Sequence, residues 1–305
     1  MTATPLGTPA SMASVRRSRR RASPGAVSLA LAAPTLCIFA GLVAIPVVSV
    51  VLTSLTSWTG FDITGITWLG IDNYSGLLTD PIFLKALVNT LIFTVATTIL
   101  LNAVGLGLDM LAATKPPGTA FLTAVLFLPV LLSPVIFGLM WSGLLRGVGG
   151  GLNQLLGFVG LIHQPVFWLG DGRFALAAVI IATVWQFAGY DMILYFAGLQ
   201  NVPDTLLEAA ELDGARGWEK FVHVVVPALY HVMSVVVLLN VIGGLRIFDI
   251  VYVMTRGGPS RSTEVLATYM YEQGFQLNAM GMASAIAVVL ILLAIGASAL
   301  RLRVL

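Results

Sequence analysis

The side chains that could do chemistry are concentrated in two parts of this 305-residue chain. The first part is the polar stretch 201–227, which holds five of the fourteen acidic residues and lies between two strongly apolar blocks. The second part is a small set of polar side chains within apolar stretches, where ionisable groups are costly and tend to face a cavity or a partner. Both patterns indicate binding and contact rather than the making and breaking of bonds.

Motifs for catalysis, metal binding and nucleotide binding are missing from the sequence. There is no G-x-x-x-x-G-K-[ST] phosphate loop, so the chain does not bind ATP by that device. His163, His223 and His231 are scattered and lack the H-E-x-x-H spacing of a zinc helix. The single cysteine, Cys37, excludes a disulfide framework. We therefore predict no catalytic residue, no metal and no cofactor in this chain.

The residue types in 201–227 predict a helix, a glycine turn and a second amphipathic segment. Pro203 suits a first helical turn, and Asn201 is expected to cap that turn. Asp204 and Glu208 then place negative charge near the positive end of the helix dipole. Gly214 is the residue type expected where a helix ends with positive φ. Because this segment is charged, we expect it to lie at a membrane surface and to face water and a partner.

The composition requires most of the remaining chain to lie in a membrane. The sequence is 58% hydrophobic and 10% charged, with a mean hydropathy of +0.95, whereas soluble domains carry about 25% charged residues. A helical crossing needs about 20 apolar residues. We predict six crossings, at about 27–56, 86–108, 119–142, 174–199, 225–252 and 279–300, within one transmembrane domain at 24–305. Prolines within the first and third crossings, Pro34, Pro46, Pro129 and Pro134, predict kinks.

The distribution of lysine and arginine predicts the orientation of these crossings. Basic residues are enriched on the cytoplasmic side of membrane proteins. With the N-terminus inside, ten basic residues fall inside and five outside, which puts both termini and 201–227 in the cytoplasm. Residues 1–23 contain five arginines and are predicted to form a disordered basic tail, with a nucleic-acid or twin-arginine role as the alternative. The net charge of +2 is too small to argue for nucleic acid.

Polar side chains within two predicted crossings suggest a path for a polar solute. Arg246 and Asp249 are three residues apart, so on one helix they would share a face and could form an ion pair. They either line a polar path or only hold helices together. Asn240 is expected to bind a sugar hydroxyl or a neighbouring helix, and Gly243 and Gly244 would let a ligand or another backbone come close.

The fourth predicted crossing offers a similar choice between binding and packing. Trp185 and Tyr190 have aromatic faces, and Gln186 and Asp191 have polar groups, a combination that suits a sugar. The same side chains could instead pack between helices and mark the inner boundary of the membrane. The sequence leaves this choice open.

The 201–227 stretch resembles a known family. Glu208-Ala209-Ala210, three residues, Gly214, nine residues and Val224-x-Val226-Pro227 are similar to the EAA loop of ABC-importer permeases, with valine replacing the isoleucine and leucine of that pattern. The flank 212–215 (LDGA) and the stretch 255–259 (TRGGP) resemble the carbohydrate-uptake branch, and the likeness extends over about 75–300. It implies an all-α polytopic membrane protein with six transmembrane helices in the type I ABC importer permease fold, in the plasma membrane of a prokaryote.

The resemblance also implies how the protein works and with what. It assigns ATPase coupling to Asp204, Leu207, Glu208, Ala209, Ala210, Asp213, Gly214 and Pro227. Candidates for the translocation path of a sugar are Gln186, Tyr190, Asn240, Gly243, Gly244, Arg246 and Asp249. The implied partners are a second permease subunit, two ATPase subunits that bind ATP and magnesium, an extracytoplasmic substrate-binding protein and membrane lipid, with no nucleic acid.

Other functions remain open at this point. Within the importer class, the substrate could be a polyol, a glycerol phosphate or an amino acid. An ion-coupled secondary transporter would usually show internal repeats and midplane carboxylates, whereas this chain has no evident inverted repeat and its acids lie mostly near water-facing ends. A membrane-embedded scaffold would keep the polar stretch but would need no polar path.

Overall fold

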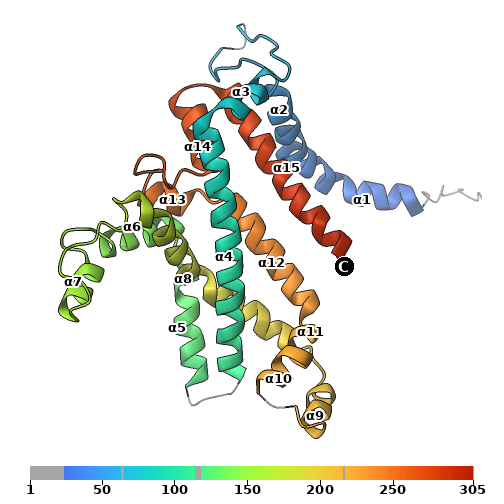
Figure 1. Ribbon diagram of the computed structural model, residues 1–305. Helices are drawn as coiled ribbons and strands as arrows, with labels where there is room; N and C mark the ends of the chain where they lie inside the picture. The colour runs from blue at the N-terminus through green and yellow to red at the C-terminus, as the bar shows by residue number, and fades with distance from the viewer. Residues whose placement is uncertain (1–23, 63–64, 114–117, 216, 305) are drawn as a thin grey trace, which may run out of the picture. The chain divides into compact units, whose positions relative to one another are not determined.

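The computed structural model describes residues 24–62, 65–113, 118–215 and 217–304, which are helical apart from short connections (Figure 1). The tail predicted for 1–23 and the polar turn 114–117 lie outside these residues. In the described part of the chain the extended pairing is limited to one isolated bridge between Thr56 and Trp68, so the all-α prediction is confirmed. The chain divides into two units, Met1–Val48 and Ser49–Leu305, which we describe separately.

The described part of the first unit, residues 24–48, is helical and strongly apolar. It contains α1 (Pro24–Phe39), a π-helical turn (Ala40–Ala44) and the beginning of α2 (Ile45–Thr53). Residues Leu31–Thr53 are long and apolar enough to cross a membrane, with a mean hydropathy of 2.6. The π turn falls directly before Pro46, where the sequence predicts a kink. Proline has no N–H to continue the α-helical pattern, and a widened turn accommodates that gap.

In the second unit, α4 (Pro81–Ala113) packs along α8 (Gly172–Leu199) and α12 (Tyr230–Leu245), as Figure 1 shows. Glycines allow these helices to approach closely. A Cβ on Gly105 would lie 2.6 Å from the Cβ of Asp191 on α8, and a Cβ on Gly244 would lie 2.8 Å from the Cα of Thr94 on α4. Small residues at helix contacts are typical of membrane bundles, where packing rather than the hydrophobic effect holds helices together.

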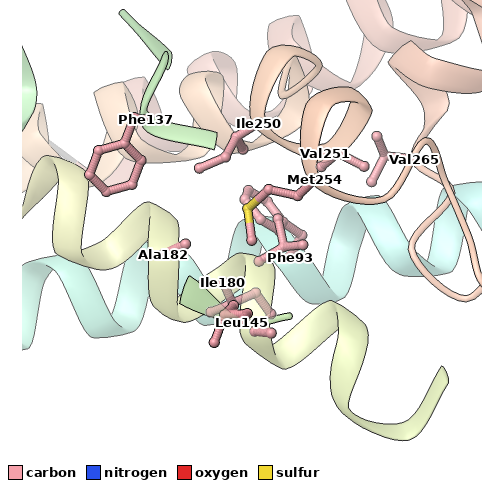
Figure 2. Close-up of a cluster of buried hydrophobic side chains, with 11 residues drawn as sticks. Phe93, Phe137, Leu145, Ile180, Ala182, Ile250, Val251, Met254 and Val265 are labelled. Atoms are coloured by element: carbon pink, nitrogen blue, oxygen red, sulfur yellow. The ribbon is translucent and has the colours of Figure 1, made fainter. Parts of the chain in front are cut away.

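A buried apolar cluster fixes the middle of this bundle (Figure 2). Phe93 from α4 lies near Met254 from α13 (Asp249–Met254), and Phe137 from α6 (Pro134–Leu144) lies near Ile250. All four side chains are at most 7% exposed. The short helices α6 and α13 are thereby anchored to the long ones.

The third predicted crossing is broken rather than kinked. α5 (Thr119–Leu131) and α6 meet at an angle of 100°. Pro129 lies within α5, and the break falls at Leu132 and Ser133, whose ψ angles are 139° and 135°. Proline forces the preceding residue out of the helical region and is favoured at the first helical position, so Pro134 explains both the end of α5 and the start of α6. A helix, α7 (Gly151–Phe158), follows.

The fifth predicted crossing, 225–252, is interrupted twice. α10 (Trp218–Lys220), a π-helical turn (Phe221–Val225) and α11 (Val226–Ala228) precede a bend of 74° at Leu229. α12 then ends at Leu245, and α13 begins only at Asp249. Two consecutive glycines weaken the last turn of α12, and the charges beyond it are better accommodated beside a cavity than within a packed helix.

The remaining helices lie at the two ends of the second unit. α3 (Asp72–Thr79) and α14 (Leu266–Tyr271) lie at one end, while α9 (Asp204–Leu212) and α10 lie at the other, together with the end of α4 (Figure 1). α15 (Met280–Val304) completes the chain. Within the described residues, four helices are long and apolar enough to span a membrane, or six when each of the two bent pairs counts as one crossing.

Candidate functional site

The start of α9 differs from the predicted cap. Pro203 is the N-cap residue, with φ −60° and ψ 131°, and its carbonyl accepts the N–H of Leu206 at 3.0 Å. The Nδ2 of Asn201 instead donates to the carbonyl of Ala197 at 2.8 Å. The prediction of an Asn201 cap is therefore wrong, because the amide satisfies a free carbonyl at the end of α8.

The end of α9 is a glycine-dependent Schellman motif. Gly214 has φ +87°, as the sequence predicts. The N–H of Ala215 donates to the carbonyl of Ala210 at 2.9 Å, and the N–H of Gly214 donates to the carbonyl of Glu211 at 3.1 Å. These two bonds satisfy carbonyls that the end of a helix leaves free. The direction in which the chain leaves α9 therefore depends on Gly214.

An exposed surface with both charged and apolar side chains surrounds this turn. A hollow of about 690 Å³ is lined by Glu208, Glu211, Leu212, Ala215, Gly217 and Lys220. Leu212 is 89% exposed and Trp218 is 73% exposed, so both side chains are accessible to a partner. The Nζ of Lys220 lies 2.6 Å from an oxygen of Glu211, which joins α10 to α9.

The other residues predicted for coupling lie around the same surface. Ala209, Asp213 and Pro227 are exposed, and Ala210 is 8% exposed on the side of α9 that packs against the π turn 221–225. Asp204 and Leu207 belong to α9, and their side chains lie outside the described part of the structure. The helix and its turn thus expose one face and bury the other.

A cavity of about 430 Å³ lies among α4, α8, α12 and the break before α13. It is lined by all seven residues predicted for a polar path, Gln186, Tyr190, Asn240, Gly243, Gly244, Arg246 and Asp249. Sequence reasoning missed the aromatic and hydroxyl side chains that complete the wall, among them Phe93, Thr97, Thr183, Phe187 and Phe248. Threonines at helical spacing in an otherwise apolar helix (Thr90, Thr94, Thr97) were the available signal for the α4 wall.

Arg246 and Asp249 do not share a helical face. Arg246 is the C-cap residue of α12, where its N–H donates to the carbonyl of Ile242 at 3.3 Å, and Asp249 is the first residue of α13. Among the described residues no ion pair joins the two side chains, and both are exposed to the cavity. The prediction that they pair along one helix is wrong, because the helix ends between them.

Two of the predicted sugar-binding residues instead make contacts between helices. The Nδ2 of Asn240 donates to an oxygen of Asp191 at 2.6 Å, which joins α12 to α8, and Asp191 is only 1% exposed. The Nε2 of Gln186 donates to the carbonyl of Leu132 at 3.3 Å, at the break between α5 and α6. Both side chains border the cavity while they hold its walls.

We expect the replacement of Asn240 by leucine to destabilise the bundle. It would leave Asp191 buried without this donor, and an unsatisfied buried polar group costs about 1–3 kcal/mol. Thermal unfolding of the purified complex in detergent should show a lower midpoint. The paired variant Asp191→Leu with Asn240→Leu removes both partners and should recover part of the loss, whereas equal midpoints for wild type and Asn240→Leu would contradict this role.

The loop 255–265 before α14 is held by a charge cluster. Arg261 lies 3.0 Å from Glu264 and 2.7 Å from Glu272. The hydrogen bonds that Arg261 donates to Glu272 raise the pKa of Arg261, and burial raises the pKa of Glu264 against the opposing effects of Thr268 and Arg261. Asn89 on α4 donates to the carbonyl of Glu264 at 2.9 Å. The loop is therefore fixed to the bundle.

The comparison with known families agrees with this architecture. Residues 110–305 match the family described as binding-protein-dependent transport system inner membrane component. The chain belongs to this family. Its members are transport components, so this permease chain is not an enzyme, and the resemblance seen in the sequence is confirmed.

Individual relatives agree with this family assignment. The chain is 35% identical to a probable ABC transporter permease protein, YurN, of Bacillus subtilis, over 87% of this chain and 91% of that one. It is 29% identical to the sulfoquinovosyl glycerol transport system permease protein SmoG of Agrobacterium fabrum, over 91% and 90% of the two chains. A crystal structure of a bacterial ABC transporter involved in alginate import superposes with a TM-score of 0.77 at 22% identity, covering 91% and 95%. The likeness to this solved chain confirms the predicted fold class.

Proposed function

We propose that this permease forms half of the translocation path of an ATP-driven carbohydrate importer and is driven through α9. The observation that carries the proposal is continuity along the chain: α9 contacts the π turn 221–225, which leads through α11 into α12, and α12 forms one wall of the polar cavity. A movement of α9 can therefore be passed to the cavity along a single bent segment, which runs from the π turn through α11 into α12.

The mechanism that follows is alternating access. A cytoplasmic ATPase subunit binds the exposed surface around Glu208, Leu212 and Trp218, and its closure moves α9. The bend at Leu229 and the gap between α12 and α13 let one part of the bundle rotate against another. Interrupted helices at substrate sites are a recurrent feature of transporters, since the broken ends offer polar backbone groups at membrane depth.

The proposed partners follow from the same arrangement. They are a second permease subunit, two ATPase subunits that hold ATP and magnesium, and an extracytoplasmic substrate-binding protein. The relative SmoG is named for sulfoquinovosyl glycerol transport, and the solved alginate transporter has been crystallised with an oligosaccharide-bound periplasmic protein, which supports a carbohydrate and a binding protein here. The basic-residue count supports cytoplasmic termini in a prokaryotic plasma membrane.

Charge reversal at Glu208 is expected to weaken coupling. Glu208 is exposed beside Glu211 and Lys220, so Glu208→Lys reverses the charge of the proposed ATPase contact without disturbing buried contacts. We expect substrate-stimulated ATPase activity of the reconstituted complex to fall about tenfold, the effect of 1.4 kcal/mol in binding. Glu208→Gln should be milder, and wild-type stimulation in Glu208→Lys would show that the contact lies elsewhere.

Uptake by the complete complex in proteoliposomes tests the proposed function. The complex of both permeases, the ATPase and the binding protein is supplied with maltose, lactose, raffinose, glycerol 3-phosphate or glutamine, with and without ATP inside. ATP-dependent uptake of at least one saccharide is expected. Transport of only glycerol 3-phosphate or glutamine would refute the substrate class, and uptake driven by an ion gradient without ATP would identify a secondary transporter.

A further inference from the structure

Four aromatic side chains form a continuous ladder next to the cavity. The ring centroids of Phe248 and Tyr252 lie 5.1 Å apart and are stacked, and Tyr271 lies 5.4 Å from Phe248 and 5.3 Å from Tyr252. Phe275 stacks on Tyr271 at 5.3 Å. We name these four residues the aromatic ladder. They come from the break before α13, from α13 itself, from α14 and from the π-helical turn Glu272–Gln276.

Two rings of the ladder, Phe248 and Tyr252, line hollows, and Tyr271 packs against both of these rings. Phe248 lines the cavity among α4, α8 and α12. Its stacked neighbour Tyr252 lines a second hollow of about 430 Å³ beneath the loop 255–265, which the proposed orientation places on the outer side. We call this loop the outer loop and this hollow the outer hollow. The outer hollow lies beside α14, at the end of the unit opposite α9. The stacked pair of Phe248 and Tyr252 therefore has one ring at each hollow.

The ladder is unlike a packing core. Phe275 is 65% exposed, and the other three rings are only partly buried by this chain. Within the described part of the chain, the hydroxyl groups of Tyr252 and Tyr271 have no hydrogen-bond partner. Flat apolar faces with free hydroxyl groups at their edges provide both the stacking surface and the hydrogen bonds that a ligand site needs.

The polar groups beside the ladder balance in charge. The outer hollow is lined by two arginines, Arg256 and Arg261, and two glutamates, Glu264 and Glu272, so two positive and two negative charges sum to zero. The inner cavity has one of each, Arg246 and Asp249. This chain therefore offers neither hollow a net charge that would select an anion or a cation.

Hydrogen bonds and a π-helical turn hold the segments around the ladder in a defined position. The outer loop is fixed to α4, where Lys85 and Asn89 donate to the carbonyls of Ser260 and Glu264 at 2.8 and 2.9 Å. The π turn that places Phe275 over Tyr271 is of a rare type that is frequent at functional sites. A rigid frame of this kind suits a binding surface because little order is lost when a ligand arrives.

We propose that the aromatic ladder is a separate outer subsite for an uncharged saccharide, which stacks on Tyr271 and Phe275 before it enters the cavity. The apolar C–H faces of a sugar ring would lie on the aromatic faces, while its hydroxyl groups would meet the tyrosine hydroxyls, Gln276 and the charged pairs. This inference rests on the proposed function and adds to it a transfer site between the binding protein and the cavity.

The test compares sugar uptake with ATP hydrolysis in the reconstituted complete complex. The probe is whichever of maltose, lactose and raffinose the wild-type complex transports fastest. If sugar released from the binding protein is not retained by the ladder, ATP is hydrolysed without transport. In Phe275→Leu and in Tyr271→Leu we expect the sugar transported per ATP hydrolysed to fall about fivefold, the size of an aromatic contact.

Control variants separate ligand binding from structure. Tyr271→Phe keeps the ring and loses only the hydroxyl, so the ratio should fall about twofold, the effect of a neutral hydrogen bond of about 0.5 kcal/mol. Phe158→Leu removes a ring that is 91% exposed on α7 and should change nothing. A parallel loss of uptake and ATPase activity in the leucine variants, equal behaviour of Tyr271→Phe and Tyr271→Leu, or an unchanged ratio would overturn the subsite. If the wild type transports none of the three sugars, the proposed function fails instead, and the subsite fails with it.

Discussion

Replacement of Gly214 by proline is expected to reduce ATP-driven uptake by more than about tenfold while the transmembrane bundle stays folded. Gly214 has φ +87°, whereas proline is fixed near −65°, so the chain would have to leave α9 in another direction. The substitution also removes the N–H that donates to Glu211, a bond of about 1 kcal/mol. Because α9 lies at the end of the unit, on an exposed surface, the damage is local and should act on the contact with the ATPase.

The chain contains a matched control for this substitution. α7 ends in the same motif: Gly160 has φ +79°, and the N–H groups of Leu161 and Gly160 donate to the carbonyls of Leu156 and Gly157 at 2.9 and 3.1 Å. Gly160→Pro therefore causes the same local damage at a helix outside the 201–227 segment. We expect uptake to fall by more than about tenfold in Gly214→Pro and to remain near wild type in Gly160→Pro. Uptake and binding-protein-stimulated ATPase activity are both measured in proteoliposomes. Equal losses in the two variants would show that α9 has no special role.

The sequence predicts α9 and its turn well because their determinants are local. Pro203 and Gly214 act through their own backbone angles, which distant contacts do not change. The cap at Asn201 could not be predicted in the same way. Its side chain can hydrogen-bond either to the N–H groups of α9 or to a carbonyl at the end of α8. Only the folded chain shows that the Nδ2 of Asn201 lies 2.8 Å from the carbonyl oxygen of Ala197.

The cavity could be predicted in its members but not in its geometry. Polar residues in apolar stretches are costly, and this cost identified Asn240, Arg246 and Asp249 as residues that must face something other than lipid. Helical spacing then suggested a pair along one helix, which the break after Leu245 excludes. The 100° break before Pro134 was similarly visible only as a kink, since its angle depends on how α6 packs against α13.

The aromatic ladder was invisible in the sequence. Tyr252 and Tyr271 are nineteen residues apart and belong to different helices, so no period links them. Aromatic side chains in apolar stretches are also the residues most often used for packing, and their individual positions therefore indicate nothing special. Only the three-dimensional contacts reveal that these rings pack together and that Tyr252 lines a hollow.

Replacing two adjacent glycines of α12 should have two different effects: substitution of Gly244 should destabilise the helix bundle, and a large side chain at Gly243 should block transport. A Cβ on Gly244 would lie 2.8 Å from the Cα and 2.9 Å from the Oγ1 of Thr94, whereas a Cβ on Gly243 would meet nothing within 4 Å and would point into open space beside the cavity. Gly244→Ala forces α12 away from α4 and should cost about 1–3 kcal/mol of packing. We expect a lower midpoint of thermal unfolding and a smaller yield of assembled complex.

Gly243→Phe should leave assembly intact and block transport, because its ring fills the cavity instead of a helix contact. We expect uptake to fall by more than about tenfold at a thermal midpoint near that of wild type. Gly243→Ala is the matched control: alanine favours a helix over glycine by about 1 kcal/mol and leaves most of the cavity open, so stability should hold and transport should continue. Because a scaffold would need no cavity, normal uptake in Gly243→Phe would refute the polar path, whereas equal instability of Gly243→Ala and Gly244→Ala would refute the assigned helix contact.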